Sequence, residues 1–306
     1  MPQEKPDWTI LPLLETTARY FRDKGISSAR VDAELLMAHL MGKKRIDLYL
    51  EHDRPLSRDE VSRFRDMVRA RAGGKPVQRI TGETEFYSVP LAVGEGVFIP
   101  RPETELLVDR GIEYFRALPK GEGRLACEVG AGTGAVSIAL ARNVPDLRVI
   151  AVDLSPQAVA CARSNAERAG VEGRVEVREG DFAETLVSRA GEWDLIVSNP
   201  PYVTAEEMES LPTEVGDHDP RTALFGGSEG LDVYRRLVPA AAGALGEEGL
   251  LLLEVSDAVA DGVLGLIAAQ EALEEGTVAR DYGGVRRVVS ARMRKAPPEP
   301  PTAGEE

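Results

Sequence analysis

An amide, two prolines and a phenol follow an apolar stretch of the chain, as Asn199-Pro200-Pro201-Tyr202. Consecutive prolines fix φ and remove two N–H donors, so we expect a rigid loop that presents carbonyl oxygens and one side-chain amide. The Asn199 side-chain oxygen and the Pro200 carbonyl can accept both hydrogens of a planar NH₂ group, on which Tyr202 stacks. Orientation and fixed dipoles would then turn the nitrogen lone pair toward an electrophile. The loop predicts alkylation of a planar nitrogen and does not choose between a glutamine amide and an adenine amino group.

A glycine-rich turn lies upstream, as Glu128-Val129-Gly130-Ala131-Gly132-Thr133-Gly134 between an apolar run and a helical stretch. Glycines at the carboxyl end of a strand let the backbone approach a ligand closely. The spacing of Gly130, Gly132 and Gly134 is G-x-G-x-G, which differs from the G-x-G-x-x-G of dinucleotide sites. The acid Glu128 can pair with an ammonium group, whereas it would repel a pyrophosphate. The turn therefore favours a nucleoside that carries an amino-acid arm.

Two more acids follow the next two apolar runs. Asp153 is placed to accept both ribose hydroxyls, as acids do in ribose-binding sheets. Its alternative role is to cap a helix, although Ser155 could do that instead. Asp181 could accept from an adenine amino group while Phe182 packs on the ring. Three acids beside one glycine turn predict S-adenosylmethionine as the cofactor.

Composition limits the classes of protein that fit. The 306 residues carry a net charge of −14, which argues against stable binding to DNA, because affinity for phosphates comes from Lys and Arg. The charge is uneven: residues 1–80 have a net charge of +4 and the remainder −18. A basic head on an acidic body is compatible with a protein partner, a limited RNA contact or an ordinary solvated surface.

Targeting and redox signals are few. The two cysteines, Cys127 and Cys161, lack metal-ligand spacing, so we expect free thiols and no metal. No apolar run is long enough for a transmembrane helix, and the first residues lack the layout of a secretory signal. These observations favour a cytoplasmic protein.

The first 75 residues are predicted to form a small helical bundle. Apolar residues recur at helical spacing, and Ser57 followed by Glu60 is a capping box that opens the third helix. Residues 76–100 are predicted to be a β-hairpin connector, because 77–81, 85–87 and 91–93 are short runs separated by Gly and Pro. A helix is expected over 103–118.

Residues 101–295 are predicted to form an α/β domain. Apolar runs alternate with helical stretches, which implies a parallel sheet covered on both faces; the runs are 125–129, 149–152, 175–177, 195–197 and 250–255. Two last runs, around 277–279 and 287–290, are joined by Tyr282-Gly283-Gly284 and predict an antiparallel pair at the edge. The tail, 296–306, is too polar to build a core and is expected to be disordered.

The sequence resembles the release-factor glutamine methyltransferase family over nearly its whole length, to about Met293. The resemblance is carried by Gly82-x-x-Glu85-Phe86-Tyr87, Phe98-Ile99-Pro100-Arg101-Pro102-Glu103-Thr104-Glu105, the glycine turn, Asn199-Pro200-Pro201-Tyr202, and Asp219-Pro220-Arg221-Thr222-Ala223-Leu224-Phe225-Gly226-Gly227. The block from Ile99 to Glu105 is the most specific, because the related ribosomal-protein glutamine methyltransferases differ there.

The resemblance implies transfer of a methyl group to N5 of the glutamine in the Gly-Gly-Gln loop of peptide-chain release factors. It also implies a seven-stranded, Rossmann-like class I methyltransferase domain behind a helical head that contacts the release factor. Phe98, Arg101 and Glu103 would then line the entrance near the target glutamine, although Arg101 could equally form a surface ion pair. Two departures are Asp219, where the family usually has Glu, and Val255-Ser256-Asp257-Ala258, where it usually has Gly and Gln positions.

Three alternatives remain open. A DNA adenine-N6 methyltransferase would use the same loop on a flipped base, but the acidic charge and the missing DNA-reading domain disfavour it. A second alternative is a methyltransferase that acts on a ribosomal-protein glutamine. A nucleotide-sensing adaptor would bind the cofactor without turnover.

Overall fold

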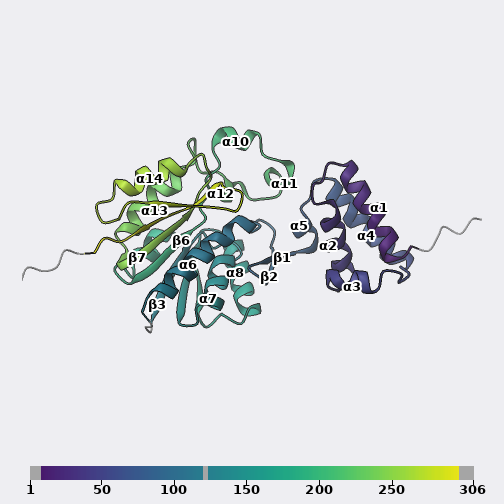
Figure 1. The fold of residues 1–306 in the computed structure, drawn as a ribbon, viewed down its shortest axis with the longest axis horizontal. Helices are drawn as coiled ribbons and strands as arrows, with labels where there is room; N and C mark the ends of the chain where they lie inside the picture. Colours follow the sequence, from purple (N-terminus) through teal and green to yellow (C-terminus); the bar gives the residue numbers. More distant parts are fainter. Residues whose placement is uncertain (1–7, 120–122, 296–306) are drawn as a thin grey trace, which may run out of the picture. The chain divides into compact units, whose positions relative to one another are not determined.

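The computed structural model describes residues 8–119 and 123–295, which form two compact units (Figure 1). The first unit consists of Met1–Glu83 together with Pro212–His218, and the second of Thr84–Leu211 together with Asp219–Glu306. The segment Pro212–His218 therefore leaves the second unit in sequence and returns to it seven residues later. The predicted disordered tail, 296–306, lies outside the described residues.

The first unit is helical, as predicted. Its helices are α1 (Ile10–Asp23), α2 (Ala29–Met41), α3 (Arg45–Leu50), α4 (Arg58–Ala72), α5 (Val77–Thr81) and α11 (Thr213–Gly216). The capping box of α4 is confirmed, with Ser57 and Glu60 each accepting from the other's backbone N–H. The apolar stripes of these helices meet in one core around residues such as Phe21, Leu36 and Phe64.

A buried cation joins three parts of the first unit. Arg71 of α4 is only 4% exposed, and its guanidinium pairs with Asp32 of α2 at 2.6 Å and with Glu214 of α11 at 2.7 Å. A buried charge is costly unless it is paired, so each carboxylate compensates the desolvation of Arg71. The pairing ties the returning segment to the helical bundle.

One local prediction is wrong. Residues Val77–Thr81, expected to be extended, form the short helix α5, which ends at Gly82 with φ 73°. Val77 packs into the helical core, and this tertiary contact overrides the β-branched composition of the segment. The hairpin itself is confirmed as β1 (Glu83–Phe86) and β2 (Val89–Ala92).

The hairpin turn is held by α6 (Glu105–Ala117), which follows the 3₁₀ turn η1 (Pro102–Thr104). Tyr87 and Ser88 have φ values of 50° and 59°, a conformation that non-glycine residues seldom adopt. Tyr87 compensates with two hydrogen bonds: its N–H donates to Glu105 at 2.7 Å and its hydroxyl to Asp109 at 2.8 Å. The Glu85-Phe86-Tyr87 motif thus has a structural use.

The second unit is the predicted α/β domain, with a seven-stranded sheet in the order β5-β4-β3-β6-β7-β9-β8. The strands are β3 (Arg124–Val129), β4 (Leu147–Asp153), β5 (Val175–Glu179), β6 (Trp193–Ser198), β7 (Leu245–Glu254), β8 (Thr277–Arg280) and β9 (Arg286–Arg292). Strands β3 to β7 are parallel, and β9 pairs antiparallel with β7 and β8, as expected for the last two runs.

Helices cover both faces of this sheet (Figure 1). One layer contains α6, α7 (Ala135–Asn143) and α8 (Pro156–Arg168), and the other contains α9 (Phe182–Val187), α13 (Asp232–Ala242) and α14 (Ala260–Ala268). Two short helices, α10 (Ala205–Glu209) and α12 (Arg221–Leu224), follow β6. Burial on both faces explains why the central strands are continuously apolar.

Asn165 connects the hairpin to the glycine turn from within α8. Its side chain is fully buried; its oxygen accepts from the Ala92 N–H at 2.7 Å, and its amide donates to the carbonyls of Ala92 at 3.0 Å and Thr133 at 2.9 Å. Three backbone groups therefore depend on one side chain that the sequence did not single out.

We expect Asn165→Ala to lower the free energy of unfolding by about 2–4 kcal/mol, because buried backbone groups lose their partners. Asn143→Ala is the control, since among the described residues the Asn143 side chain bonds within its own helix, to the Ala139 carbonyl. Urea unfolding followed by circular dichroism measures both variants. Equal costs for the two would contradict the bridging role.

Candidate active site

The glycine turn and the Asn-Pro-Pro-Tyr loop meet where the strand order reverses. From β3 the chain proceeds to β4 and β5 on one side, and β6 then pairs with the other side of β3. Val129 at the end of β3 is in register with Ser198 at the end of β6, and the Ser198 hydroxyl donates to the Val129 carbonyl at 2.7 Å. Ligands of open α/β sheets bind at such a switch point, beyond the carboxyl ends of the strands.

A cavity of about 300 Å³ lies at this switch point, entirely within the second unit. Its lining is mostly apolar, with a few convergent polar groups. Predicted site residues in the lining are Phe98, Glu128, Gly130, Gly132, Asp153, Phe182, Asn199, Pro200, Pro201 and Tyr202. Arg101, Glu103, Gly134 and Asp181 do not line it.

The glycine turn wraps back over β4. The N–H groups of Gly130 and Ala131 both donate to the Val152 carbonyl, at 2.9 and 3.1 Å. All three predicted glycines have positive φ, and Gly134 also faces α8, where a Cβ would lie 3.1 Å from the Cβ of Ala162. The third glycine therefore serves close packing of the helix, while the first two face the cavity.

Glu128 is buried at the end of β3, where it is 4% exposed. Its carboxylate accepts from both the backbone N–H and the hydroxyl of Ser137. Burial raises the pKa of Glu128 to about 8, although the Ser137 hydrogen bonds oppose the shift. A cation brought to this carboxylate from the cavity would favour its charged form.

Asp153 lies across the glycine turn from Glu128. One carboxylate oxygen accepts from the Gly132 N–H at 2.9 Å and the other from the Ser155 N–H at 2.9 Å. Ser155 provides the N-cap of α8 by accepting from Ala158. Asp153 is therefore free of the capping role that was its alternative, and its half-buried carboxylate faces the cavity.

Asp181 is engaged elsewhere in the structure. Its carboxylate caps α9 by accepting from the Ala183 N–H at 2.9 Å and pairs with Arg236 at 2.6 Å, and both contacts hold its pKa below the ordinary value. The Arg236 guanidinium also lies 5.1 Å from the centre of the Phe182 ring and lines the cavity. The predicted contact of Asp181 with an adenine stays a prediction.

The Asn-Pro-Pro-Tyr loop is held on one side by the motif that runs from Asp219 to Gly227. The chain after Tyr202 pairs with this motif through hydrogen bonds between Val203 and Leu224 and between Gly226 and Val203, each 2.9 Å long. A Cβ on Gly226 would lie 2.5 Å from the Pro201 carbonyl, so only glycine fits there. The two motifs thus form one rigid wall of the cavity.

The other side chains of this loop face inward. The Asn199 amide donates to the Thr104 hydroxyl at 3.2 Å, and the Tyr202 hydroxyl donates to Glu254 at 3.5 Å. Burial raises the pKa of Tyr202 well above its ordinary value, so its hydroxyl keeps its proton. Thr104 and Glu254 were not predicted as site residues, because a buried Thr and an acid at a strand end carry no distinctive spacing.

Arg101 forms an ion pair, but with a buried partner and not at the surface as its alternative role supposed. Its guanidinium pairs with Asp219, whose side chain is fully buried, and lies 5.1 Å from the centre of the Phe98 ring. Asp219, where the family usually has Glu, therefore retains the charge partner. Phe98 and Pro100 line the cavity, whereas Arg101 supports Phe98 from behind.

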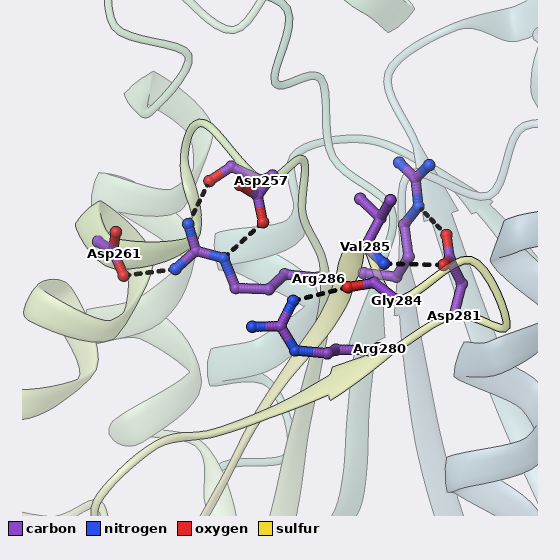
Figure 2. Close-up of polar contacts among 8 residues, drawn as sticks. Asp257, Asp261, Arg280, Asp281, Gly284, Val285 and Arg286 are labelled. Atoms are coloured by element: carbon purple, nitrogen blue, oxygen red, sulfur yellow. Dashed lines mark hydrogen bonds and ion pairs between the residues drawn. The ribbon is translucent and has the colours of Figure 1, made fainter.

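The second departure, after Glu254, is held by charged side chains (Figure 2). Arg286 of β9 donates to the Asp257 carboxylate at 2.6 Å, to its carbonyl at 2.7 Å and to the Asp261 carboxylate at 2.6 Å. These bonds anchor the loop after β7 to the strand beside it. The contacts that hold the loop after β7 therefore differ from those that hold the cavity wall.

Within residues 8–119 and 123–295, no group of three or more His, Cys, Asp and Glu side chains could hold a metal ion. Across the same described ranges, no helix is both long and apolar enough to cross a membrane.

The fold and the site define a class I methyltransferase. A seven-stranded sheet carries a glycine turn, an acid at the end of β4 and an Asn-Pro-Pro-Tyr loop around one cavity. The cavity fits S-adenosylmethionine, because a buried acid, a half-buried acid and apolar walls match the charged, polar and apolar parts of that cofactor. Family models agree: residues 12–82 match the PrmC N-terminal domain and 104–214 the methyltransferase small domain.

Curated relatives identify the family. The chain is 40% identical to the release factor glutamine methyltransferase of Geobacter sulfurreducens, over 95% of this chain and 99% of the relative. It is 37% identical to that of Rhodopirellula baltica, over 94% and 97%. Among solved structures, the ribosomal protein L11 methylase of Lactobacillus delbrueckii subsp. bulgaricus is similar, with 21% identity over 67% of this chain and 84% of that one, and a TM-score of 0.46. The chain belongs to the release factor glutamine methyltransferase family and is an S-adenosylmethionine-dependent enzyme.

Burial of Glu128 predicts a pH dependence of stability in the protein without cofactor. Between the ordinary pKa of 4.5 and about 8, the folded protein holds a proton that the unfolded chain has released. The free energy of unfolding should therefore fall as pH rises through this window and then level off. Across this window the free energy of unfolding of Glu128→Gln should fall by at least about 1 kcal/mol less than that of the original protein, since one pKa unit corresponds to about 1.4 kcal/mol. Urea unfolding at several pH values measures this, and an equal loss in both proteins would refute it.

Proposed function

We propose that this enzyme transfers a methyl group from S-adenosylmethionine to the side-chain amide N5 of the glutamine in the Gly-Gly-Gln motif of peptide-chain release factors, in the cytoplasm. The observation that carries the proposal is the placement of Asn199 and Pro200 at the end of β6, beside the glycine turn of β3. The names of relatives at 34–40% identity support the substrate.

The cofactor end of the cavity is assigned to the glycine turn and its acids. Glu128 pairs with the ammonium of the amino-acid arm, Asp153 accepts from the ribose hydroxyls, and Gly130 and Gly132 keep the backbone clear of the ligand. Phe182 packs on the adenine, with Arg236 behind it, and Asp181 supports this wall. When bound, S-adenosylmethionine supplies a methyl group on a sulfonium, which is a strong electrophile.

The acceptor end is assigned to the Asn-Pro-Pro-Tyr loop. Asn199 Oδ1 and the Pro200 carbonyl accept the two amide hydrogens of the glutamine, and Tyr202 stacks on the amide plane. A glutamine amide is a poor nucleophile because its lone pair is delocalised, so the loop acts by holding the nitrogen in line for displacement. The alkylated nitrogen then loses one proton to solvent, and no general base is required. Pro201 keeps the loop rigid.

The substrate side is assigned to the segment before η1. Phe98 faces the cavity, Arg101 lies against its ring and pairs with Asp219, and the exposed Glu103 is assigned to contacts with the release factor. The helical head, with its net positive charge, is assigned to the release factor. Transfer to a DNA adenine is disfavoured by the net charge of −14.

Mass spectrometry of the release-factor glutamine peptide, after incubation with enzyme and cofactor, tests the proposal. Methylation of that glutamine is expected. Asn199→Ala should lower methyl transfer about a hundredfold to a thousandfold, because a fixed acceptor of the reacting group is lost, while cofactor affinity persists. Asn143→Ala, on the outer face of α7, is the control. Methylation of DNA but not of release factor would sink the proposal, and turnover by neither would favour a nucleotide-sensing adaptor.

Asp153→Ala should have the opposite effect to Asn199→Ala, with weaker cofactor binding and retained methyl transfer. Loss of a carboxylate that accepts from the ribose should weaken cofactor binding about tenfold to a hundredfold, while turnover at saturating cofactor is retained. Calorimetric titration with S-adenosylmethionine measures the affinity. Glu179→Ala is the matched control, because Glu179 is an exposed acid at the end of the next strand. Unchanged affinity in Asp153→Ala would remove Asp153 from the cofactor site.

A further inference from the structure

Thr104 lies directly behind the acceptor loop. It ends η1, is 4% exposed and lines the cavity beside Asn199. Its hydroxyl oxygen accepts the hydrogen bond from Asn199 Nδ2 at 3.2 Å. The orientation of the Asn199 amide, which decides whether its oxygen or its nitrogen faces the substrate, is therefore determined at this contact.

Glu254 lies at the end of β7 and is 2% exposed. One of its oxygens accepts from the Tyr202 hydroxyl, whereas Oε2 has no well-formed hydrogen bond within the described structure. Burial raises the pKa of Glu254 to about 7, and the Thr104 hydroxyl is the neighbouring group that most opposes this shift. Thr104 is thus a hydroxyl close to a buried carboxyl group that has one oxygen without a hydrogen bond.

The single hydrogen of Thr104 links these two contacts. Above a pH of about 7 the ionised Glu254 carboxylate can only accept, so a hydroxyl that donates to it can only accept from Asn199. Nδ2 must then face Thr104, which leaves Oδ1 for the acceptor. The opposite orientation would direct the Asn199 NH₂ at the planar NH₂ of the substrate, where two donors oppose each other.

We propose that Thr104 and Glu254 are positioning residues that fix the polarity of the Asn199 amide, so that Oδ1 meets the nitrogen to be methylated. The inference rests on the proposed role of Asn199. It adds one requirement to the acceptor loop. The loop can orient the glutamine amide for methyl transfer only while the Thr104 hydroxyl donates its hydrogen away from the cavity.

The experiment compares Thr104→Val, which keeps the shape and removes the hydroxyl, with Thr104→Ser, which keeps the hydroxyl. Thr104→Val should lower kcat for glutamine methylation about tenfold to a hundredfold, because an orienting hydrogen bond is lost. Its affinity for S-adenosylmethionine, measured by calorimetry, should stay within about threefold of the original, and Thr104→Ser should restore most of kcat. Thr185→Val, another buried threonine of the same unit, controls for loss of a core hydroxyl.

A double variant separates positioning from general structural damage. If Thr104 acts only through Asn199, adding Thr104→Val to Asn199→Ala should cost no further activity in single-turnover measurements. Equal losses in both backgrounds would overturn the proposal, as would a normal kcat in Thr104→Val. Glu254→Gln should also lower kcat, because a glutamine can either donate or accept and no longer specifies the direction of the Thr104 hydroxyl.

A measurement without turnover keeps the proposal separate from the choice of substrate. In isotope-labelled protein, the side-chain amide protons of Asn199, assigned by their loss in Asn199→Ala, should exchange slowly and become fast in Thr104→Val. Fast exchange in the unaltered protein would overturn the polarity proposal. An unaltered protein that fails to methylate release factor but shows slow exchange would refute only the proposed substrate.

Discussion

The site depends on one register, that between β3 and β6. Because Val129 is paired with Ser198, the glycine turn and the acceptor loop leave the sheet side by side, and the Ser198 hydroxyl locks them together. A slip of one residue would turn every side chain of β6 to the opposite face and bury the loop. Such a slip would be costly, because alternate residues of each strand pack into the two different cores that cover the faces of the sheet. The chemistry is thus positioned by core packing.

Much of this arrangement could be predicted from the sequence. The apolar runs, the glycine spacing and the double proline each have a direct physical meaning, and they predicted the sheet and the two loops that line the cavity. Strand order could not be derived from them, because alternation of strands and helices does not say where the chain reverses. The helix at Val77–Thr81 was missed because its short run of β-branched residues has the composition of a strand.

The polar residues behind the site were harder to predict. Asn165, Thr104 and Glu254 act on neighbours that are far away in sequence, and no local pattern marks them. The acids illustrate the opposite case: Asp153 ends one strand and Asp181 comes just after the next, yet only Asp153 faces the cavity, while Asp181 caps a helix. An aspartate at the end of a strand can thus serve different uses. Asp153 is left for the cavity because Ser155 caps the next helix, whereas Asp181 is itself the cap.

The returning segment Pro212–His218 has a consequence for how this protein can be divided. The helical head is completed by residues that the chain supplies only after the acceptor loop has been made, and Glu214 gives the buried Arg71 its second carboxylate. A fragment cut after residue 83 would carry a desolvated cation with one partner missing. The helical head therefore cannot be exchanged between relatives on its own. It must be exchanged between relatives together with a strand-to-helix loop from the other half of the gene, so the two units are expected to change in concert during evolution.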